Sequence, residues 1–598
     1  DMTTKKIPVK YTSREFDTIK SDLMKYAKRY YPETYRDFGA ASMGSMYLGA
    51  VSYVGDMLSF YLDYQVNELF LDTATEYDNI IKLGSQLGYS YEGRAGSVGE
   101  AEIYAIVPAN STGLGPDTNY LPIVQAGTTI SSDAGAAFIT TEDARFDDSR
   151  NQVVVARVND TTGVPTHYAV KVPVRVVSGE IRSLKIAIGE YEKFKKVKLS
   201  NTDVSEVFSV VDTDGHEYYQ VDYLSQDVIY KDVANRGSDS DMVPSVLRPF
   251  VAPRRFVVER LRNTTYLQFG HGTSAELTNS SVSGPLELSL QMHGRDYTTD
   301  KAFDPSKLMS TDKFGIAPAN TTIIVKYRVN TASNANVSVN GLRKLKVKKI
   351  KFNDSRSLSN TKMLDVEASM EVSNSNPIIG GISLPDITEI KRRAKDSYAA
   401  QNRGVTKQDI ESMAYTMPIK YGAIKRCRTR RKKCTVRRNI ELYVLSEGTD
   451  GKLTAATDTL KQNLKMWLAE KKMMNDSIDI RDAKIVNYGI EFSINVDPNE
   501  NKYEVLNNSI AAVQDAMSEP LYIGEPLYVS DIYGILNKVR GVVDAKMVKT
   551  TNKTGIGYSS TSVKMDDLLS ADGLTVHSPE NVALEVKYPA SDIKGAIV

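Results

Sequence analysis

The sequence contains very little cysteine and tryptophan. Its 598 residues include two cysteines, Cys427 and Cys434, and one tryptophan. A secreted protein held together by disulfides normally carries more cysteines, so we expect a reducing compartment. The first twenty residues lack the apolar core of a signal peptide, which argues against export by that route. The net charge is only +1, so the chain as a whole has no general attraction to nucleic acid or to anionic membranes.

The motifs of common catalytic and cofactor sites are also missing. No Walker loop, dinucleotide fingerprint or G-x-S-x-G elbow occurs. The two cysteines are seven residues apart, whereas zinc and redox sites favour a two-residue spacing. The histidines are scattered, and we expect His271, between two glycines, to lie in a turn or at the end of a strand rather than to bind a ligand. We therefore predict no catalytic residue, no metal and no cofactor.

The longest apolar stretch does not have the composition of a membrane span. Between Met43 and Leu62 the only charged residue is Asp56. The favourable insertion energies of the Leu, Val and Phe residues sum to roughly 2–3 kcal/mol, and a central Asp costs about 2.5–3.5 kcal/mol. Three glycines and three serines weaken insertion further. The stretch therefore belongs to a protein core or to a surface that meets another chain.

Helical spacing favours the second of these two interpretations. Residues 42–70 form one long predicted helix, with a polar side that includes Ser52, Asp56 and Asp63. Two shorter predicted helices flank it, one capped by Ser13 and one ending near Gly84 or Gly88. Three helices can pack into a bundle within one chain. Here, however, apolar residues lie around much of the circumference of the long helix, and two short helices cannot cover all of them, so we predict a bundle shared between chains. Its partner-facing residues are predicted to be Met43, Met46, Tyr47, Ala50, Val54, Met57, Leu58 and Tyr61.

The rest of the chain predicts an α+β multidomain protein. After the helical core-bundle segment 1–95 come short alternating runs with turn residues, of which Asp212–Gly215 is a strong hairpin signal. Further on, Gly404 is expected to end one helix, and Thr406 with Asp409 resembles a capping box at the start of the next. The predicted domains are an antiparallel β domain at 96–240, a second β-rich region with an irregular insert at 241–345, an α+β domain at 346–500, and an α+β region with a C-terminal tail at 501–598.

Two clusters of charge leave alternatives open. The hairpin that includes Cys427 and Cys434 carries Arg428, Arg430, Arg431, Lys432 and Lys433. It could be a solvated hairpin, a docking site for an acidic protein surface, or a nucleic-acid contact, and the last is the least favoured. Asp212, Asp214 and Glu217 could form the paired carboxylates of a polysaccharide-binding or glycan-processing protein, although turn chemistry explains them better.

Segments along nearly the whole chain resemble a known family. They include "YTSREFDTIKSDLMKYAKRYY", "YVGDMLSFYLDYQVNELFLDTATEYDNIIKLGSQLGY", "DTDGHEYYQVDYLSQD" and "RRFVVERLRNTTYLQFGHG". Together they are similar to the baseplate wedge protein of T-even-type contractile-tailed phages, a relative of the baseplate J-like proteins. The basic hairpin is not part of the resemblance.

The resemblance implies a structural role and no enzymatic activity. It implies a virion protein of the tail baseplate that is made late in infection and assembled in the host cytoplasm. It also implies that the N-terminal helices form a bundle together with a larger wedge protein. It also implies homodimers formed through region 501–598, and a ring of dimers around the central hub that holds the sheath and rearranges on contraction. Other wedge, sheath-proximal and hub proteins would be further partners, with no membrane involved. A similar subunit of a contractile injection machine unrelated to phage is the remaining alternative.

Overall fold

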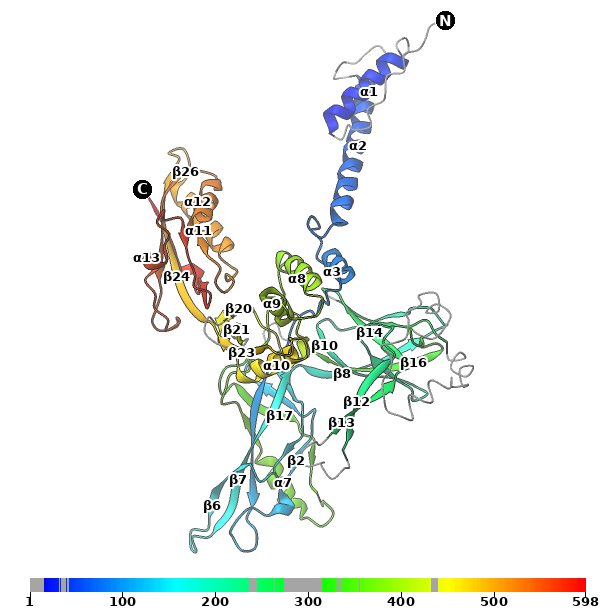
Figure 1. The fold of residues 1–598 in the computed structure, drawn as a ribbon, viewed down its shortest axis with the longest axis vertical. Coiled ribbons are helices and arrows are strands. Elements are labelled where there is room, and N and C mark those ends of the chain that lie inside the picture. Colours follow the sequence, from blue (N-terminus) through cyan, green and yellow to red (C-terminus); the bar gives the residue numbers. More distant parts are fainter. Residues whose placement is uncertain are drawn as a thin grey trace. The chain divides into compact units, whose positions relative to one another are not determined.

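The computed structural model describes residues 15–31, 33, 39, 42–235, 245–262, 264–273, 314–330, 335–353, 355–431 and 439–598. The chain divides into two compact units. One comprises Asp1–Ser90 with Pro385–Tyr398, and the other comprises Tyr91–Leu384 with Ala399–Val598. Helices form the N-terminal part, antiparallel sheets the middle and mixed elements the C-terminal part, so the predicted α+β class is confirmed (Figure 1). The five predicted domain boundaries remain a prediction.

The first unit is helical. It contains α1 (Phe16–Tyr30), α2 (Met43–Glu68), α3 (Tyr77–Gln86) and most of α8 (Ile387–Ala400). The hydroxyl of Ser42 accepts the backbone N–H of Ser45 at 3.2 Å and so caps α2. Glu15 occupies the N-cap position of α1, so the prediction of a Ser13 cap is wrong, and Ser13 itself lies outside the described residues. Of the two predicted ends of α3, Gly84 is wrong because it lies inside the helix, whereas Gly88 is confirmed: it follows the helix and adopts φ +85°, which glycine tolerates.

The first sheet of the second unit joins strands that are far apart in the sequence. Its order is β17-β3-β4-β7-β1-β19, with β6 paired to β7. Alternate residues of β1 and β7, such as Ile103 and Val172, point into one core. The strands are β1 (Val98–Pro108), β3 (Thr129–Ser132), β4 (Ala137–Thr140), β6 (Gln152–Val158), β7 (Pro165–Ser178), β17 (Leu342–Val347) and β19 (Glu371–Ser373). Short strands β2 (Ile123–Val124), β5 (Ala144–Arg145) and β18 (Ile350–Lys351) and helix α7 (Asn360–Ala368) accompany it.

The second sheet has the order β8-β16-β10-β11-β14-β15-β9, and β12 and β13 form a separate ribbon. The predicted hairpin at Asp212–Gly215 is confirmed, since it joins β10 to the antiparallel β11. The strands are β8 (Glu180–Ile188), β9 (Lys196–Lys198), β10 (Val204–Asp212), β11 (Glu217–Gln220), β12 (Val228–Ala234), β13 (Ser245–Val251), β14 (Arg255–Arg260), β15 (Thr265–Phe269) and β16 (Thr321–Val329).

A smaller mixed sheet follows. The capping box predicted for α9 (Lys407–Tyr415) is confirmed: Thr406 accepts the N–H of Asp409, whose carboxylate accepts the N–H of Thr406. The prediction that Gly404 ends α8 is wrong, because the helix stops at Ala400 and the next two residues, Gln401 and Asn402, adopt positive φ. The strands β20 (Arg426–Arg431), β21 (Asn439–Glu447), β22 (Leu453–Thr454) and β23 (Ser477–Asp482) pack beside α10 (Asp458–Ala469).

The C-terminal part is a sheet with helices on it. Strand β24 lies in the centre, antiparallel to β26 and parallel to β28 and β29, and α11 and α12 contribute to the same core. The elements are β24 (Lys484–Val496), α11 (Lys502–Ala516), β25 (Leu527–Tyr528), α12 (Val529–Lys538), β26 (Val542–Asn552), α13 (Met565–Leu568), β27 (Thr575–Val576), β28 (Val582–Glu585), α14 (Pro589–Asp592) and β29 (Ile593–Ile597). The last strand was not predicted from the sequence.

Candidate functional site

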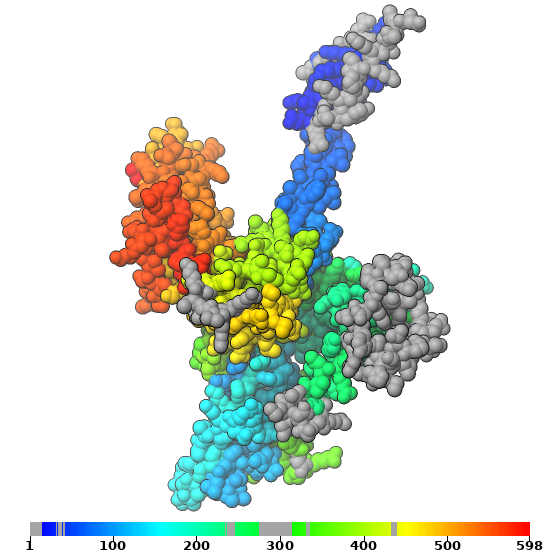
Figure 2. Space-filling model, in the orientation of Figure 1, coloured from blue at the N-terminus to red at the C-terminus, as the bar shows by residue number. Residues whose placement is uncertain are grey.

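Helix α2 exposes its apolar side chains to solvent. The eight predicted partner-facing residues are all exposed, and Met43 and Tyr47 reach 71% and 63%. Among the helices in the described ranges, none is both long and apolar enough to cross a membrane. Figure 2 shows the lower part of α2, in blue, as a rod whose surface is formed by its own side chains. Further exposed apolar residues of the same helix and the turn after it are Val51, Tyr53, Phe60, Leu62, Val66, Leu69 and Phe70.

The small and polar side of α2 contacts α1. Ser45 and Ser52 are buried at 4% and 0% exposure, and the Ser52 hydroxyl donates to the Leu48 carbonyl at 2.6 Å. A Cβ placed on Gly55 would lie 3.4 Å from Cδ1 of Ile19. Small residues allow the two helices, which lie against each other, to approach closely. The pairing of α1 with α2 therefore uses the side of α2 that was predicted to be polar and leaves the apolar side uncovered.

The C-terminal end of α2 is fixed by one carboxylate. Glu68 accepts the backbone N–H and the hydroxyl of Thr75, both at 2.7 Å, and the side-chain amide of Asn79 at 3.0 Å. It also accepts the backbone N–H of Glu76 at 3.3 Å, at the start of α3. Hydrogen bonds from Asn79 and Thr75 lower the pKa of Glu68 to about 2. The ionised carboxylate therefore ties the end of α2 to the beginning of α3, where the helix dipole also favours negative charge.

Polar contacts with α8 hold the same corner. The Lys395 ammonium pairs with the Asp72 carboxylate, and this hydrogen bond lowers the pKa of Asp72. The Lys391 ammonium donates to the Asp72 carbonyl at 2.9 Å, and the Tyr77 hydroxyl donates to the Pro385 carbonyl at 3.2 Å. The helix that carries the exposed apolar side is thus anchored at its C-terminal end.

The described part of the basic hairpin makes several contacts within the chain. Arg426 is buried, lies 4.4 Å from the ring centre of Tyr522 and donates to the Pro520 carbonyl at 3.1 Å. Arg430 pairs with Glu580 at 3.4 Å. Of the predicted docking residues, Arg428 and Arg431 are exposed, while Lys432 and Lys433 lie outside the described residues. Docking at this hairpin remains a prediction.

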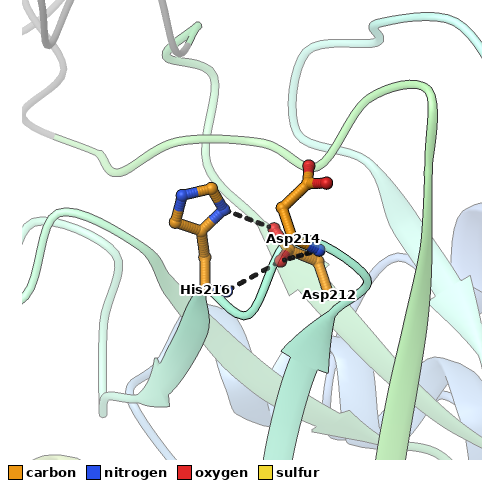
Figure 3. Close-up of side chains that lie close together, drawn as sticks. All are labelled: Asp212, Asp214 and His216. Carbon is orange, nitrogen blue, oxygen red and sulfur yellow. Dashed lines mark hydrogen bonds and ion pairs between the residues drawn. The ribbon is translucent and has the colours of Figure 1, made fainter.

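The carboxylates considered for polysaccharide chemistry have the geometry of a turn (Figure 3). Asp212 is buried, and its Oδ1 accepts the backbone N–H groups of Asp214 at 3.0 Å and His216 at 2.8 Å. Its Oδ2 lies 3.0 Å from Nδ1 of His216. Burial raises the pKa of Tyr218 to about 12, and the Asp212 charge adds to the effect. The side chains of Asp212, Asp214 and His216 lie close enough to share a cation. The carboxylate oxygens of Asp212, however, already accept the hydrogen bonds that shape the hairpin.

Glu217, the third of these carboxylates, is exposed and accepts the Tyr219 hydroxyl at 2.7 Å. His271 stacks on Phe194 with ring centres 5.5 Å apart, and its backbone carbonyl accepts the Tyr191 hydroxyl. Next to it, the N–H of Gly272 donates to the Gly315 carbonyl at 2.9 Å. These contacts are structural in character.

Comparison with known proteins places the exposed helix in a defined context. Residues 16–86 match the family model described as the N-terminal domain of the bacteriophage baseplate protein. The match covers α1, α2 and α3, and it confirms the predicted resemblance to baseplate proteins for this part of the chain. No curated protein matches the chain.

Two solved structures match the chain with low sequence identity and low structural similarity. The baseplate of the anti-feeding prophage matches with 9% identity and a TM-score of 0.22, over 94% of this chain and 90% of that chain. The TssK-TssF-TssG baseplate subcomplex of the type VI secretion system matches with 10% identity and a TM-score of 0.25, over 74% of this chain and 96% of that chain. At these TM-scores neither match bears on the function of this chain.

Proposed function

We propose that this chain is a structural subunit of a phage tail baseplate wedge, and that α2 contributes its apolar side to a helical bundle shared with another chain. One observation carries the proposal: the segment that matches the baseplate family model contains a helix with Ser45 and Ser52 buried and most of its apolar residues exposed. A continuous exposed apolar surface of this kind marks an interaction site.

The size of this surface is adequate for stable association. Burying eight apolar side chains at roughly 1.5–3 kcal/mol each would supply about 12–24 kcal/mol before the entropy and association costs are subtracted. The partner that fits is one or more amphipathic helices, because an apolar side along a helix packs against another such side. In the wedge this partner would be the larger wedge protein.

The second part of the proposal concerns the C-terminal region 501–598. Strand β26 forms an edge of its sheet among the described residues, and it exposes Val543 and Met547 at 61% and 50%. Pairing of this region with a second copy would give homodimers. Contacts through the N-terminal helices would then alternate with contacts through the C-terminal region and close a ring around the central hub. This ring would hold the sheath and rearrange when the tail contracts.

The proposed role is non-enzymatic and belongs to the virion tail baseplate, after late synthesis and assembly in the host cytoplasm. Other wedge, sheath-proximal and hub proteins would complete the set of partners, without a membrane or nucleic acid. The turn geometry of Asp212 gives no support to the polysaccharide alternative.

Single charges on the apolar side of α2 test the proposal. Tyr47→Asp and Val54→Asp should each block formation of the wedge complex, because each places a carboxylate in a dry interface. Asn67→Asp, on the side of the helix that carries the predicted polar stripe, is the matched control and should assemble normally. Co-purification of the chain with its wedge partners measures assembly, and circular dichroism measures whether the sheets stay folded. Normal assembly of both apolar-side variants would refute the proposed bundle.

A further inference from the structure

Strand β6 is an edge strand whose first half, Gln152–Val155, lacks the bulges and charges that usually protect an edge. It pairs with β7, and within the described residues no strand pairs with its other side (Figure 1). All of its residues are exposed, and Val153, Val154 and Val155 reach 44%, 61% and 50%. Val153 and Val155 point to one face of the strand and Val154 to the other, so both faces and the backbone edge are accessible.

The other edges of the same sheet are protected differently. Strand β17 exposes Arg343, Lys344 and Lys346, and Arg343 pairs with Asp133 at 2.8 Å. Strand β19, at the opposite edge, has only three residues. Charged side chains and short length are the devices by which sheets avoid pairing with other chains. Strand β6 instead presents a valine-rich edge with a single charge, Arg157.

The register of β6 makes it complementary to itself. In an antiparallel pair centred on Val154, the two copies of that valine face each other, and Val153 faces Val155 of the other copy. Such β-branched pairs stabilise antiparallel strands. Arg157 would face Asn151, and Arg150 would face Val158, so no like charges meet between residues 150 and 158. The regular part of β6 also lies here, because its register with β7 shifts only after Val155.

We propose that β6 pairs antiparallel with β6 of a second copy of this chain, centred on Val154, which makes one continuous sheet across two copies. An unpaired strand edge presents a row of N–H and C=O groups, and a second strand satisfies them. This contact is separate from α2 and from region 501–598, so it adds a third interface to the proposed assembly.

Cysteine cross-linking of the full chain tests the register. In a background with Cys427→Ala and Cys434→Ala, Val154→Cys places two thiols opposite each other, at the Cα separation of about 4.5–5.5 Å that a disulfide can bridge. Val158→Cys is the matched control, an exposed valine of the same strand. Its two copies would be offset by eight residues, about 26 Å along the strand.

On a non-reducing gel, Val154→Cys should give a covalent dimer that reductant dissolves, at a yield about tenfold or more above that of Val158→Cys, since disulfide geometry is specific. Circular dichroism of the sheets checks that both variants are folded. Equal yields at the two positions, or no dimer at either, would overturn the proposal. Repeating the experiment in a chain that also carries Val54→Asp distinguishes this proposal from the proposed function. If β6 does not pair, the α2 bundle can still form. If the α2 bundle does not form, the disulfide at position 154 should still appear.

Discussion

Helices α2 and α10 both carry apolar residues at helical spacing and use them in opposite ways. In α10, Leu460, Leu464 and Leu468 are buried at 0–1% exposure against α9 and strand β21. In α2, Ser45 and Ser52 are buried, while the apolar side chains remain exposed. The same pattern therefore marks a core within the chain in one case and an uncovered surface in the other.

This difference shows where each helix obtains its stability. Helices in proteins are stabilised mainly by packing of their apolar side. Helix α10 finds that packing inside its own domain. Among the described residues, helix α2 contacts α1 and makes hydrogen bonds near its C-terminal end, at Tyr64, Asn67 and Glu68. Its apolar side chains remain exposed, so their packing energy is available to a partner.

The largest effect on the free chain is expected in α10. Leu464→Ala should destabilise its domain by about 2–5 kcal/mol, because it leaves a cavity at a fully buried position. Trp467, the only tryptophan, lies on the same helix, and its Nε1 donates to the Met413 carbonyl at 2.9 Å. Urea unfolding followed by its fluorescence measures the loss. A loss below about 1 kcal/mol would contradict the buried packing of α10.

A smaller effect is expected at the α2–α3 corner and should depend on pH. The pKa of Glu68 is lowered from 4.5 to about 2, so its contribution to stability is complete above about pH 4.5 and is lost as the pH falls toward 2. Glu68→Gln should remove this dependence and lower the thermal midpoint at neutral pH. Circular dichroism of the helices at a series of pH values measures both. If the thermal midpoints of the wild type and of Glu68→Gln changed with pH in the same way, the proposed role of the carboxylate would be contradicted.

A modest gain is expected where α1 crosses α2. Gly55→Ala should stabilise α2 by about 0.5–1 kcal/mol, since alanine is the better helix former and Ile19 leaves room at ordinary contact distance. Gly49→Ala is the control, because an added Cβ there meets nothing within 4 Å. Thermal unfolding followed at 222 nm compares the two. Destabilisation by Gly55→Ala alone would show that the helices pack more tightly than the structure describes.

The smallest effect on the free chain is expected for Leu58→Ala, the counterpart of the change in α10. Leu58 is 58% exposed, so its truncation should alter the stability of the isolated chain by no more than about 0.5 kcal/mol. The same change should weaken the proposed complex with the partner helices, measured by titration with the partner chain. A loss in the isolated chain as large as that for Leu464→Ala would show that α2 is packed within its own fold.

Features determined by neighbouring residues could be predicted from the sequence. The extent of α2, the hairpin at Asp212–Gly215 and the capping box of Thr406 with Asp409 depend on residues within a few positions of each other. The end of α8 was predicted at Gly404 because glycine is the usual residue there, yet Gln401 and Asn402 adopt the left-handed conformation themselves.

Features determined by distant residues could not be predicted. The pairing of Ile103 in β1 with Val372 in β19 joins parts of the chain that no local pattern connects. For the candidate site, the sequence separated a polar from an apolar side of α2 and predicted that the apolar side meets another chain. That the polar side covers α1 required the structure, because Ser52 and Gly55 carry no strong signal of burial.

Oxidation footprinting of the methionines of α2 tests the central claim most directly. Met43 and Met46 are 71% and 61% exposed in the free chain, so peroxide should oxidise them readily there, with Met474, at 99%, as the reference for dose. In the assembled baseplate the account predicts that both α2 methionines are protected, since the partner helices exclude solvent. Equal oxidation of Met43 and Met46 in the free chain and in the assembled particle would contradict it.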